Sequence, residues 1–195
     1  MKALYILTLA LLAGCATINT EEASGLPTRQ DQVILVGRFD MTPAIPQHFP
    51  NGPQQPYQNV VENRILTTFA INPSNERADF RSLMLSQNAD AVPVGRTFFI
   101  TVPRAQIFLN SGVYLTHVPT AYGLNGEVFL PGGLSTSFPA HTDVVYVGTV
   151  RYTRGNFYEI TNVNVVDEFA ATRSEIVQKF GTGTTIAKAL WAHRP

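Results

Sequence analysis

The amino-acid sequence predicts a mainly β fold, either an antiparallel β-sandwich or a partly open barrel, with one or two C-terminal helices. Three observations support this prediction. Short segments rich in Val, Ile, Phe, Tyr and Thr recur along the chain, separated by Gly, Pro and Asn. Helical spacing of apolar residues is clearest near the C-terminus. Apolar residues make up 45% of the chain, which is enough to bury a sizeable core.

The first part of the chain contains two predicted strands. Residues 32–41 begin as a continuous apolar run and then alternate, and residues 64–71 form a second run that ends in an Asn-Pro turn. Between them, residues 42–63 carry five prolines, each of which removes a backbone donor, so we expect a long loop there. Residues 75–88 fit a short helix or an irregular segment equally well.

Strand signals are densest after Gly95. Turn sequences occur at 110–112, 130–133 and 153–156, and the last of these is the best hairpin candidate because Gly155 tolerates positive φ. The predicted strands are 96–102, 105–110, 112–118, 127–130, 142–153 and 156–166.

Two of the predicted strands resemble each other. The segments 33–42 and 144–153 share a Val-Gly pair and a closing Thr, which predicts two strands in similar, central positions. The similarity is too weak to indicate an internal repeat.

Two helices are expected near the C-terminus. Residues 167–180 place apolar side chains on one face, Thr172 and Glu175 have the spacing of a capping box, and Gly181 suits the position past the helix end. A second amphipathic stretch follows Gly183 and contains Ile186, Ala187, Leu190 and Trp191.

The N-terminus has the layout of a secretory signal: Lys2, an apolar run, and two small residues before a cysteine. The twelve residues between Lys2 and Cys15 are fewer than the roughly 20 apolar residues that a spanning helix needs. The tetrapeptide Leu12-Ala13-Gly14-Cys15 resembles the lipobox of bacterial lipoproteins, and Cys15 is the only cysteine in the chain.

This resemblance implies that residues 1–14 are removed and that Cys15 becomes the lipidated first residue of the mature chain. Because Ala16 and not aspartate follows the cysteine, it also implies the outer membrane if the source has two membranes. We expect residues 15–30, which contain few large apolar groups, to form a flexible tether, and residues 31–195 to form a single β-rich domain.

Charge argues against a nucleic-acid partner. The 14 basic and 14 acidic residues balance, and no basic stripe is visible that could displace counterions from phosphates. Charged residues make up only 14% of the chain, so uncharged polar groups must cover much of its surface.

No catalytic or metal-binding motif stands out, and we predict no cofactor. The histidines His48, His117, His141 and His193 lack the spacing of metal ligands on one helical face. Serine, histidine and aspartate residues occur within one short segment, but the residues of a catalytic triad usually come from segments far apart in the sequence. These residues are Ser135, Ser137, His141 and Asp143. The loop 181–188 lacks the Gly-Lys-Ser/Thr ending of a phosphate loop, so its threonines are better explained as caps of a following helix.

We therefore expect a noncatalytic envelope lipoprotein, held at the membrane by lipidated Cys15, that binds another envelope protein or a glycan or has a structural role. Candidate contact residues are the aromatic side chains Phe49 and Tyr57 in the proline-rich loop and Tyr114 and Tyr122 near the central turns, where Phe129 and Phe138 also lie. The alternative is an envelope hydrolase that acts on cell-wall or glycan material through paired carboxylates. Its candidate carboxylates are Glu127, Asp143, Glu159, Asp167 and Glu168.

Overall fold

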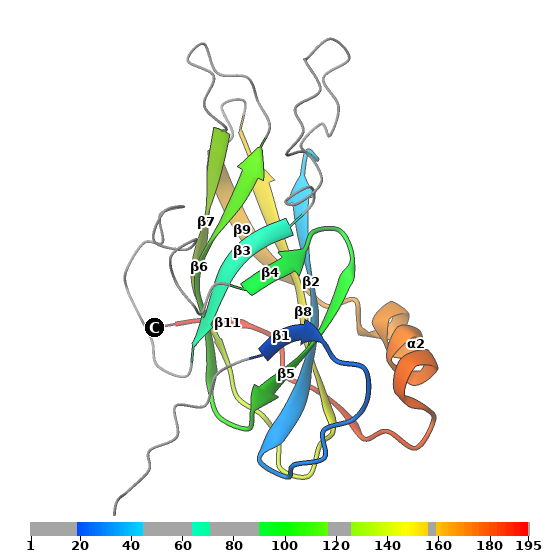
Figure 1. Ribbon diagram of the computed structural model, residues 1–195. Helices are drawn as coiled ribbons and strands as arrows, with labels where there is room; N and C mark the ends of the chain where they lie inside the picture. The colour runs from blue at the N-terminus through cyan, green and yellow to red at the C-terminus, as the bar shows by residue number, and fades with distance from the viewer. Residues whose placement is uncertain (1–18, 45–63, 71–89, 117–125, 156–158, 195) are drawn as a thin grey trace, which may run out of the picture.

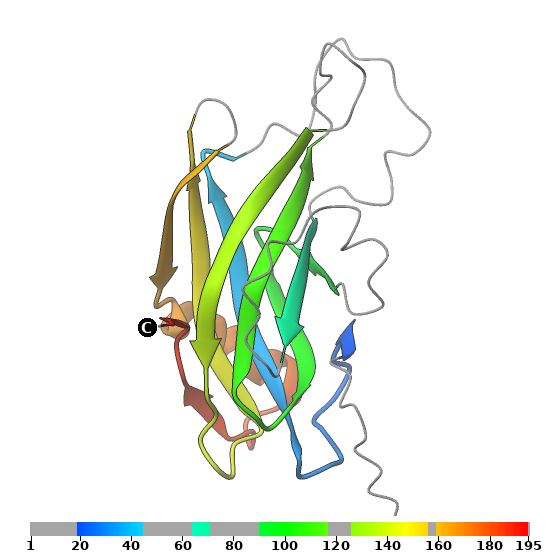
Figure 2. The ribbon, with the colours of Figure 1, turned by 90° about the vertical axis from the view of Figure 1, so that its left-hand side faces the viewer.

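The computed structural model describes residues 19–44, 64–70, 90–116, 126–155 and 159–194. These residues form eleven strands and one helix, and the strands make two sheets that pack face to face (Figures 1 and 2). The predicted mainly β class with a C-terminal helix is confirmed. The long loop expected at 42–63 lies mostly outside the described residues, and the segment 75–88 lies entirely outside them.

The larger sheet, sheet A, has six strands in the order β1-β5-β2-β8, with β9 and β10 sharing the far side of β8. β9 pairs antiparallel with the second half of β8, whereas β10 and β2 pair with β8 in parallel, so sheet A is mixed and not purely antiparallel. Its strands are β1 (Asn19–Glu22), β2 (Gln32–Thr42), β5 (Thr97–Pro103), β8 (Val144–Arg154), β9 (Ile160–Val166) and β10 (Ile186–Lys188). The predicted β8–β9 hairpin is confirmed.

The second sheet, sheet B, is antiparallel throughout, in the order β11-β7-β6-β3-β4. Its strands are β3 (Arg64–Ala70), β4 (Asp90–Pro93), β6 (Ile107–Thr116), β7 (Gly126–Thr136) and β11 (Ala192–His193).

Two predicted turns of sheet B are wrong, because they lie inside β6 and β7. Leu109 pairs with Leu134 and Ser111 pairs with Pro131, so the register shifts by a bulge where Asn110 faces the Gly-Gly pair. A Cβ atom at Gly132 would clash with the carbonyl oxygen of Asn110. Glycine and proline occur in bulges as well as in turns, and here they permit a bulge between two long strands.

The resemblance between β2 and β8 reflects direct pairing of the two strands. From Gly37, which pairs with Gly148, to Thr42, which pairs with Thr153, the pairing has the register of the sequence match. Before Gly37 it is offset from that match by one residue. Both strands are central as predicted. Val147 is the extra residue of a bulge, and Gly148 beside it has a φ of 94°. The bulge shifts the alternation of β8 by one residue.

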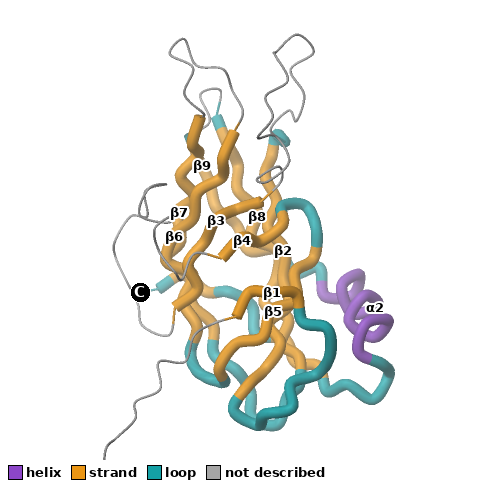
Figure 3. Tube along the Cα trace, viewed as in Figure 1, coloured by secondary structure: helices purple, strands orange, loops and turns teal. Residues whose placement is uncertain are grey.

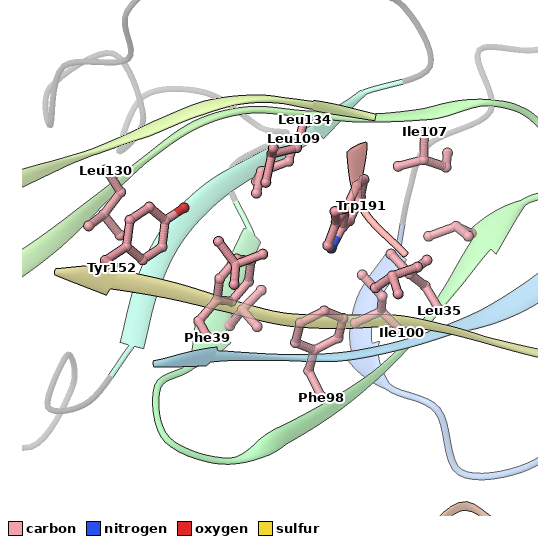
Figure 4. Close-up of a cluster of buried hydrophobic side chains, with 14 of the residues drawn as sticks. Leu35, Phe39, Phe98, Ile100, Ile107, Leu109, Leu130, Leu134, Tyr152 and Trp191 are labelled. Atoms are coloured by element: carbon pink, nitrogen blue, oxygen red, sulfur yellow. The ribbon is translucent and has the colours of Figure 1, made fainter. Parts of the chain in front are cut away.

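The main core lies between the two sheets and is apolar (Figure 4). Phe39 stacks with Phe98 at 5.4 Å and with Tyr152 at 6.4 Å between ring centroids. The side chains labelled in Figure 4 come from both sheets and from the C-terminal segment: Leu35, Phe39, Phe98, Ile100, Ile107, Leu109, Leu130, Leu134, Tyr152 and Trp191.

The helix α2 (Phe169–Phe180) packs against the outer face of sheet A (Figure 3). Gly181 ends it with a φ of 94°, as predicted. The predicted capping box is wrong, because the helix already begins at Phe169. Thr172 is inside its first turn, where the hydroxyl donates a hydrogen bond to the carbonyl of Glu168.

The second predicted helix is also wrong, because the segment after Gly183 is extended and forms β10 and β11. The edge of β8 offers it backbone partners: the N–H of Ala189 donates to the carbonyl of Tyr146 and that of Trp191 to Val147, both at 2.9 Å. Trp191 is 4% exposed between the sheets. Edge pairing and burial of this indole outweigh the helical spacing of the apolar residues.

Sheet A begins inside the segment that we expected to be a flexible tether. β1 pairs with β5, the side chain of Ala23 is buried, and the N–H of Ala23 donates to the carbonyl of Phe99 at 2.8 Å. The described part of the expected tether therefore belongs to the folded domain from Asn19 onward.

Replacing Gly148 tests the bulge in β8. We expect Gly148→Ala to lower the free energy of unfolding by about 2 kcal/mol or more, because a side chain is strained at positive φ. The added Cβ would also lie 2.9 Å from a methyl group of Val165 and 3.2 Å from the carbonyl oxygen of Val166. Urea unfolding measures this, and Gly25→Ala, where a Cβ meets no atom within 4 Å, is the control. Equal midpoints for the two variants would contradict this account.

Candidate interaction surface

The outer face of sheet A has two halves of different chemistry. The first half is apolar and is covered by α2, whose Ile176 is fully buried against Ile34, Val36 and Val144. Phe180 adds an edge contact to Phe99, with 5.7 Å between the ring centroids. The helix thus removes this half from solvent.

The second half carries polar side chains from three neighbouring strands. The pairing register aligns them in rows across the sheet, such as Asp40, Arg151 and Asn164. We define the polar face as Arg38, Asp40, Thr42, Thr149, Arg151, Thr153, Asn162, Asn164 and Glu168, the last of which immediately precedes α2.

The bulge in β8 puts these residues on one face. Before the bulge Ile34 pairs with Val144 under the helix, and after it Arg38 pairs with Thr149 and Asp40 with Arg151. Since side chains alternate along a strand, an unbulged β8 would turn Thr149 and Arg151 into the core. The bulge therefore allows β8 to match the alternation of β2 along its full length.

A chain of ion pairs runs across the polar face. Nε of Arg38 donates to Asp40 at 2.8 Å, and Nη2 of Arg151 lies 3.7 Å from the other oxygen of Asp40. The same Nη2 atom lies 3.1 Å from Oε1 of Glu168, while the hydroxyl of Thr149 donates to Oε2 of Glu168 at 2.6 Å. Both carboxylate oxygens of Glu168 are thus held by β8.

Glu168 also joins α2 to the sheet through its backbone. Its N–H donates to the hydroxyl oxygen of Tyr146 at 2.7 Å, and burial raises the pKa of Tyr146. The Tyr146 ring packs on Phe169 at 5.5 Å between centroids. The start of the helix is therefore linked directly to the polar face.

The ion pairs orient side chains more than they stabilise the fold. The side chains of Arg38 and Arg151 are 40% and 37% exposed, and pairs this accessible contribute about 0–1 kcal/mol each. Two guanidinium groups meet two carboxylates, so the face is neutral. It presents oriented hydrogen-bonding groups without a net charge.

Those predicted contact aromatics whose side chains are described lie away from the polar face. Phe49, Tyr57 and Tyr122 lie outside the described residues, as does Cys15. The backbone of Tyr114 pairs with Ile65 and Val128 in sheet B, but its side chain is not described. Phe129 is half-buried, and Phe138 is half-buried against the main core. That Phe49, Tyr57, Tyr114 and Tyr122 contact a partner therefore stays a prediction.

The histidines and serines do not form a site among the described residues. His141 is exposed with a φ of 56°, and His193 is exposed on β11, while His48 and His117 lie outside the described residues. Ser135 is on β7, pairing with Phe108, and the exposed Ser137 directly follows this strand. Within the described ranges, no group of three or more possible ligand residues could hold a metal ion.

Two of the candidate carboxylates hold β10 in place. Asp143 accepts hydrogen bonds from the N–H and the hydroxyl of Thr185, at 3.0 and 2.5 Å, and these bonds lower its pKa. Nζ of Lys188 donates to Asp167 at 2.7 Å, which lowers the pKa of Asp167. Thr185 thus joins two strands and does not cap a helix. Of the other candidates, Glu127 lies on β7 with its side chain not described, and Glu159 is exposed beside the β8–β9 loop.

Sequence reasoning overlooked Arg38, Asp40, Thr149 and Arg151. A signal was present, because Arg38 and Asp40 alternate with buried positions, as do Thr149 and Arg151. Only the pairing of β2 with β8 brings the two alternating segments together.

Comparison with protein families, with characterised proteins and with solved structures found no match for this chain. Among the residues that the structure describes, no helix has the length and apolar character needed to cross a membrane.

Acidification tests the clamp between Asp143 and Thr185. The folded-state pKa of Asp143 lies below its ordinary value of 3.8. The ionised carboxylate therefore stabilises the fold fully at pH values above 3.8, and this stabilisation is lost as the pH falls through the folded-state pKa. We expect Asp143→Asn to lower the urea midpoint most near pH 7, with the difference from the native chain shrinking below about pH 4.

A matched pair at Thr185 separates the clamp from general acid effects. Thr185→Ser keeps the hydroxyl donor and should behave like the native chain, whereas Thr185→Val should resemble Asp143→Asn. A pH-independent difference between Asp143→Asn and the native chain would contradict the assignment.

Proposed function

We propose that this chain is a bacterial envelope lipoprotein, anchored to a membrane through acyl chains on Cys15, whose β-sandwich binds an envelope partner or has a structural role there. The observation that carries the proposal is the sequence Leu12-Ala13-Gly14-Cys15, which resembles a lipobox and contains the only cysteine. The charged, apolar and small-residue regions before that cysteine have the order of an export signal. The membrane would be the outer one in a source with two membranes.

The polar face is the surface that we propose for the partner. It combines hydroxyl and amide groups with guanidinium groups whose orientation is fixed by Asp40 and Glu168. Such preorganised groups lose little conformational freedom on binding. Their chemistry and neutral charge fit a polar partner, either another envelope protein or a glycan, and not a nucleic acid.

The alternative of an envelope hydrolase gains no support from the described residues. Asp143, Asp167 and Glu168 each accept hydrogen bonds within the domain, and these bonds place them in structural roles. A glycosidase needs two carboxylates across a cleft, one of them with a raised pKa, whereas the pKa values of Asp143 and Asp167 are lowered.

Anchoring is tested by fatty-acid labelling of Cys15. In bacteria given labelled palmitate, the native chain should incorporate label and lose residues 1–14, whereas Cys15→Ser should do neither, because it lacks the thiol that accepts the lipid. Ala16→Ser keeps the thiol and serves as the control. Recovery of the native chain with a free Cys15 thiol would refute the proposal.

The partner surface is tested by charge reversal on the polar face. Envelopes are cross-linked and captured through a tag after Pro195, comparing the native chain with Arg151→Glu and with Arg173→Glu on the exposed side of α2. We expect Arg151→Glu alone to lose the captured protein or glycan. The free energy of unfolding should change by less than about 1 kcal/mol in Arg173→Glu and by more in Arg151→Glu, where the new carboxylate lies beside Asp40 and Glu168. Urea unfolding of both variants checks that each is still folded. Equal capture by the two variants would argue against the polar face.

A further inference from the structure

We infer that one defined side of the sandwich rests directly on the lipid bilayer. This side, the β1 side, consists of β1 and the connection 23–31 between β1 and β2. The inference rests on the proposed anchoring at Cys15 and adds to it an orientation of the domain.

The length of chain between the anchor and the sheet carries the argument. Only residues 16–18 separate Cys15 from Asn19, where β1 begins. Four Cα-to-Cα steps of at most about 3.6 Å bring Asn19 within about 14 Å of Cys15. A domain of this size is about 40 Å across, so this link is too short for the domain to turn its far side to the membrane.

The point where the chain joins the domain is an edge strand of sheet A. β1 pairs with β5 through Asn19 and Thr101 and through Glu22 and Ile100. Nζ of Lys179 donates to Glu22 at 2.7 Å and lies 5.1 Å from the ring centroid of Phe99, which ties α2 to β1. The short link is therefore attached to a strand that pairs with sheet A and contacts α2.

An exposed apolar side chain lies on the same side. Among the described residues, Leu26 is the large hydrophobic residue left exposed, at 40%, and it is in the connection that follows β1. Figures 1 and 2 show this connection, in blue, running from β1 down to the start of β2. A leucine next to a lipid anchor can enter the interfacial region of the bilayer, where its exposure is favourable.

The same orientation keeps the polar face accessible. β9 occupies the edge of sheet A opposite β1, four strands away, which corresponds to about 19 Å at the usual spacing. Polar-face residues on β8 and β9, such as Arg151 and Asn162, therefore lie on the side remote from the lipid. A soluble or membrane-bound partner can reach them while the domain stays anchored.

Depth-dependent quenching tests the orientation. Acylated Thr28→Cys and Asn162→Cys chains, both substituted at exposed positions, are labelled with a nitrobenzoxadiazole fluorophore. They are bound to vesicles of phosphatidylethanolamine and phosphatidylglycerol, with or without a nitroxide on the lipid headgroup. We expect the nitroxide to quench the label at residue 28 strongly and the label at residue 162 little or not at all.

A lengthened link is the matched control. Inserting about 15 Gly and Ser residues between Thr17 and Ile18 leaves Cys15 and β1 intact but adds a coil with an average span of about 20 Å. The difference between the two labels should then disappear. Equal quenching of both labels with the native link, or an unchanged difference after the insertion, would overturn the inference.

The anchoring and the orientation fail in distinguishable ways. If the labelled native chain does not sediment with the vesicles, the proposed anchoring is wrong and the orientation falls with it. If the chain sediments but its two labels are quenched equally, only the orientation is wrong.

Discussion

The parallel pairing of β2 with β8, with its bulge at Gly148, is the constraint on which the rest of this molecule depends. The two strands occupy the centre of sheet A, and their inward side chains form one wall of the main core. The bulge keeps both strands in the same alternation although the paired stretch of β8 has one residue more than that of β2. Without the bulge, either the apolar side chains of β8 would point to solvent or its polar side chains would point into the core.

The outer face of sheet A shows how one sheet meets two environments. Its apolar half needs a cover, which α2 supplies through Ile176. Its polar half needs none, because Asp40 and Glu168 satisfy the guanidinium groups beside them. Glu168 belongs to both halves, since it starts the helix and completes the ion-pair chain. The covered half and the polar half are therefore joined at this one residue.

The two ends of the described chain close the sandwich in different ways. The C-terminal segment leaves β8 after β10, buries Trp191 between the sheets and then pairs with sheet B through β11. The N-terminal segment adds β1 to the opposite edge of sheet A. Anchoring through a link as short as residues 16–18 would give the domain a fixed membrane side, with the polar face at a distance from it.

The sequence by itself determined the mainly β class, most of the strands, the helix before Gly181, and the signal and cysteine that carry the proposed anchoring. These features are local, because they follow from side-chain periodicity and from short motifs. Only the tertiary structure decided that the Gly-rich segment of β7 is a bulge and not a turn, and that the Trp191 segment is extended and not helical. It alone brought Arg38 and Asp40 beside Thr149 and Arg151. Those outcomes depend on pairing with other strands, which for β2 and β8 lie more than a hundred residues apart in the chain, or on burial between sheets. No local pattern records which strand will provide the partner.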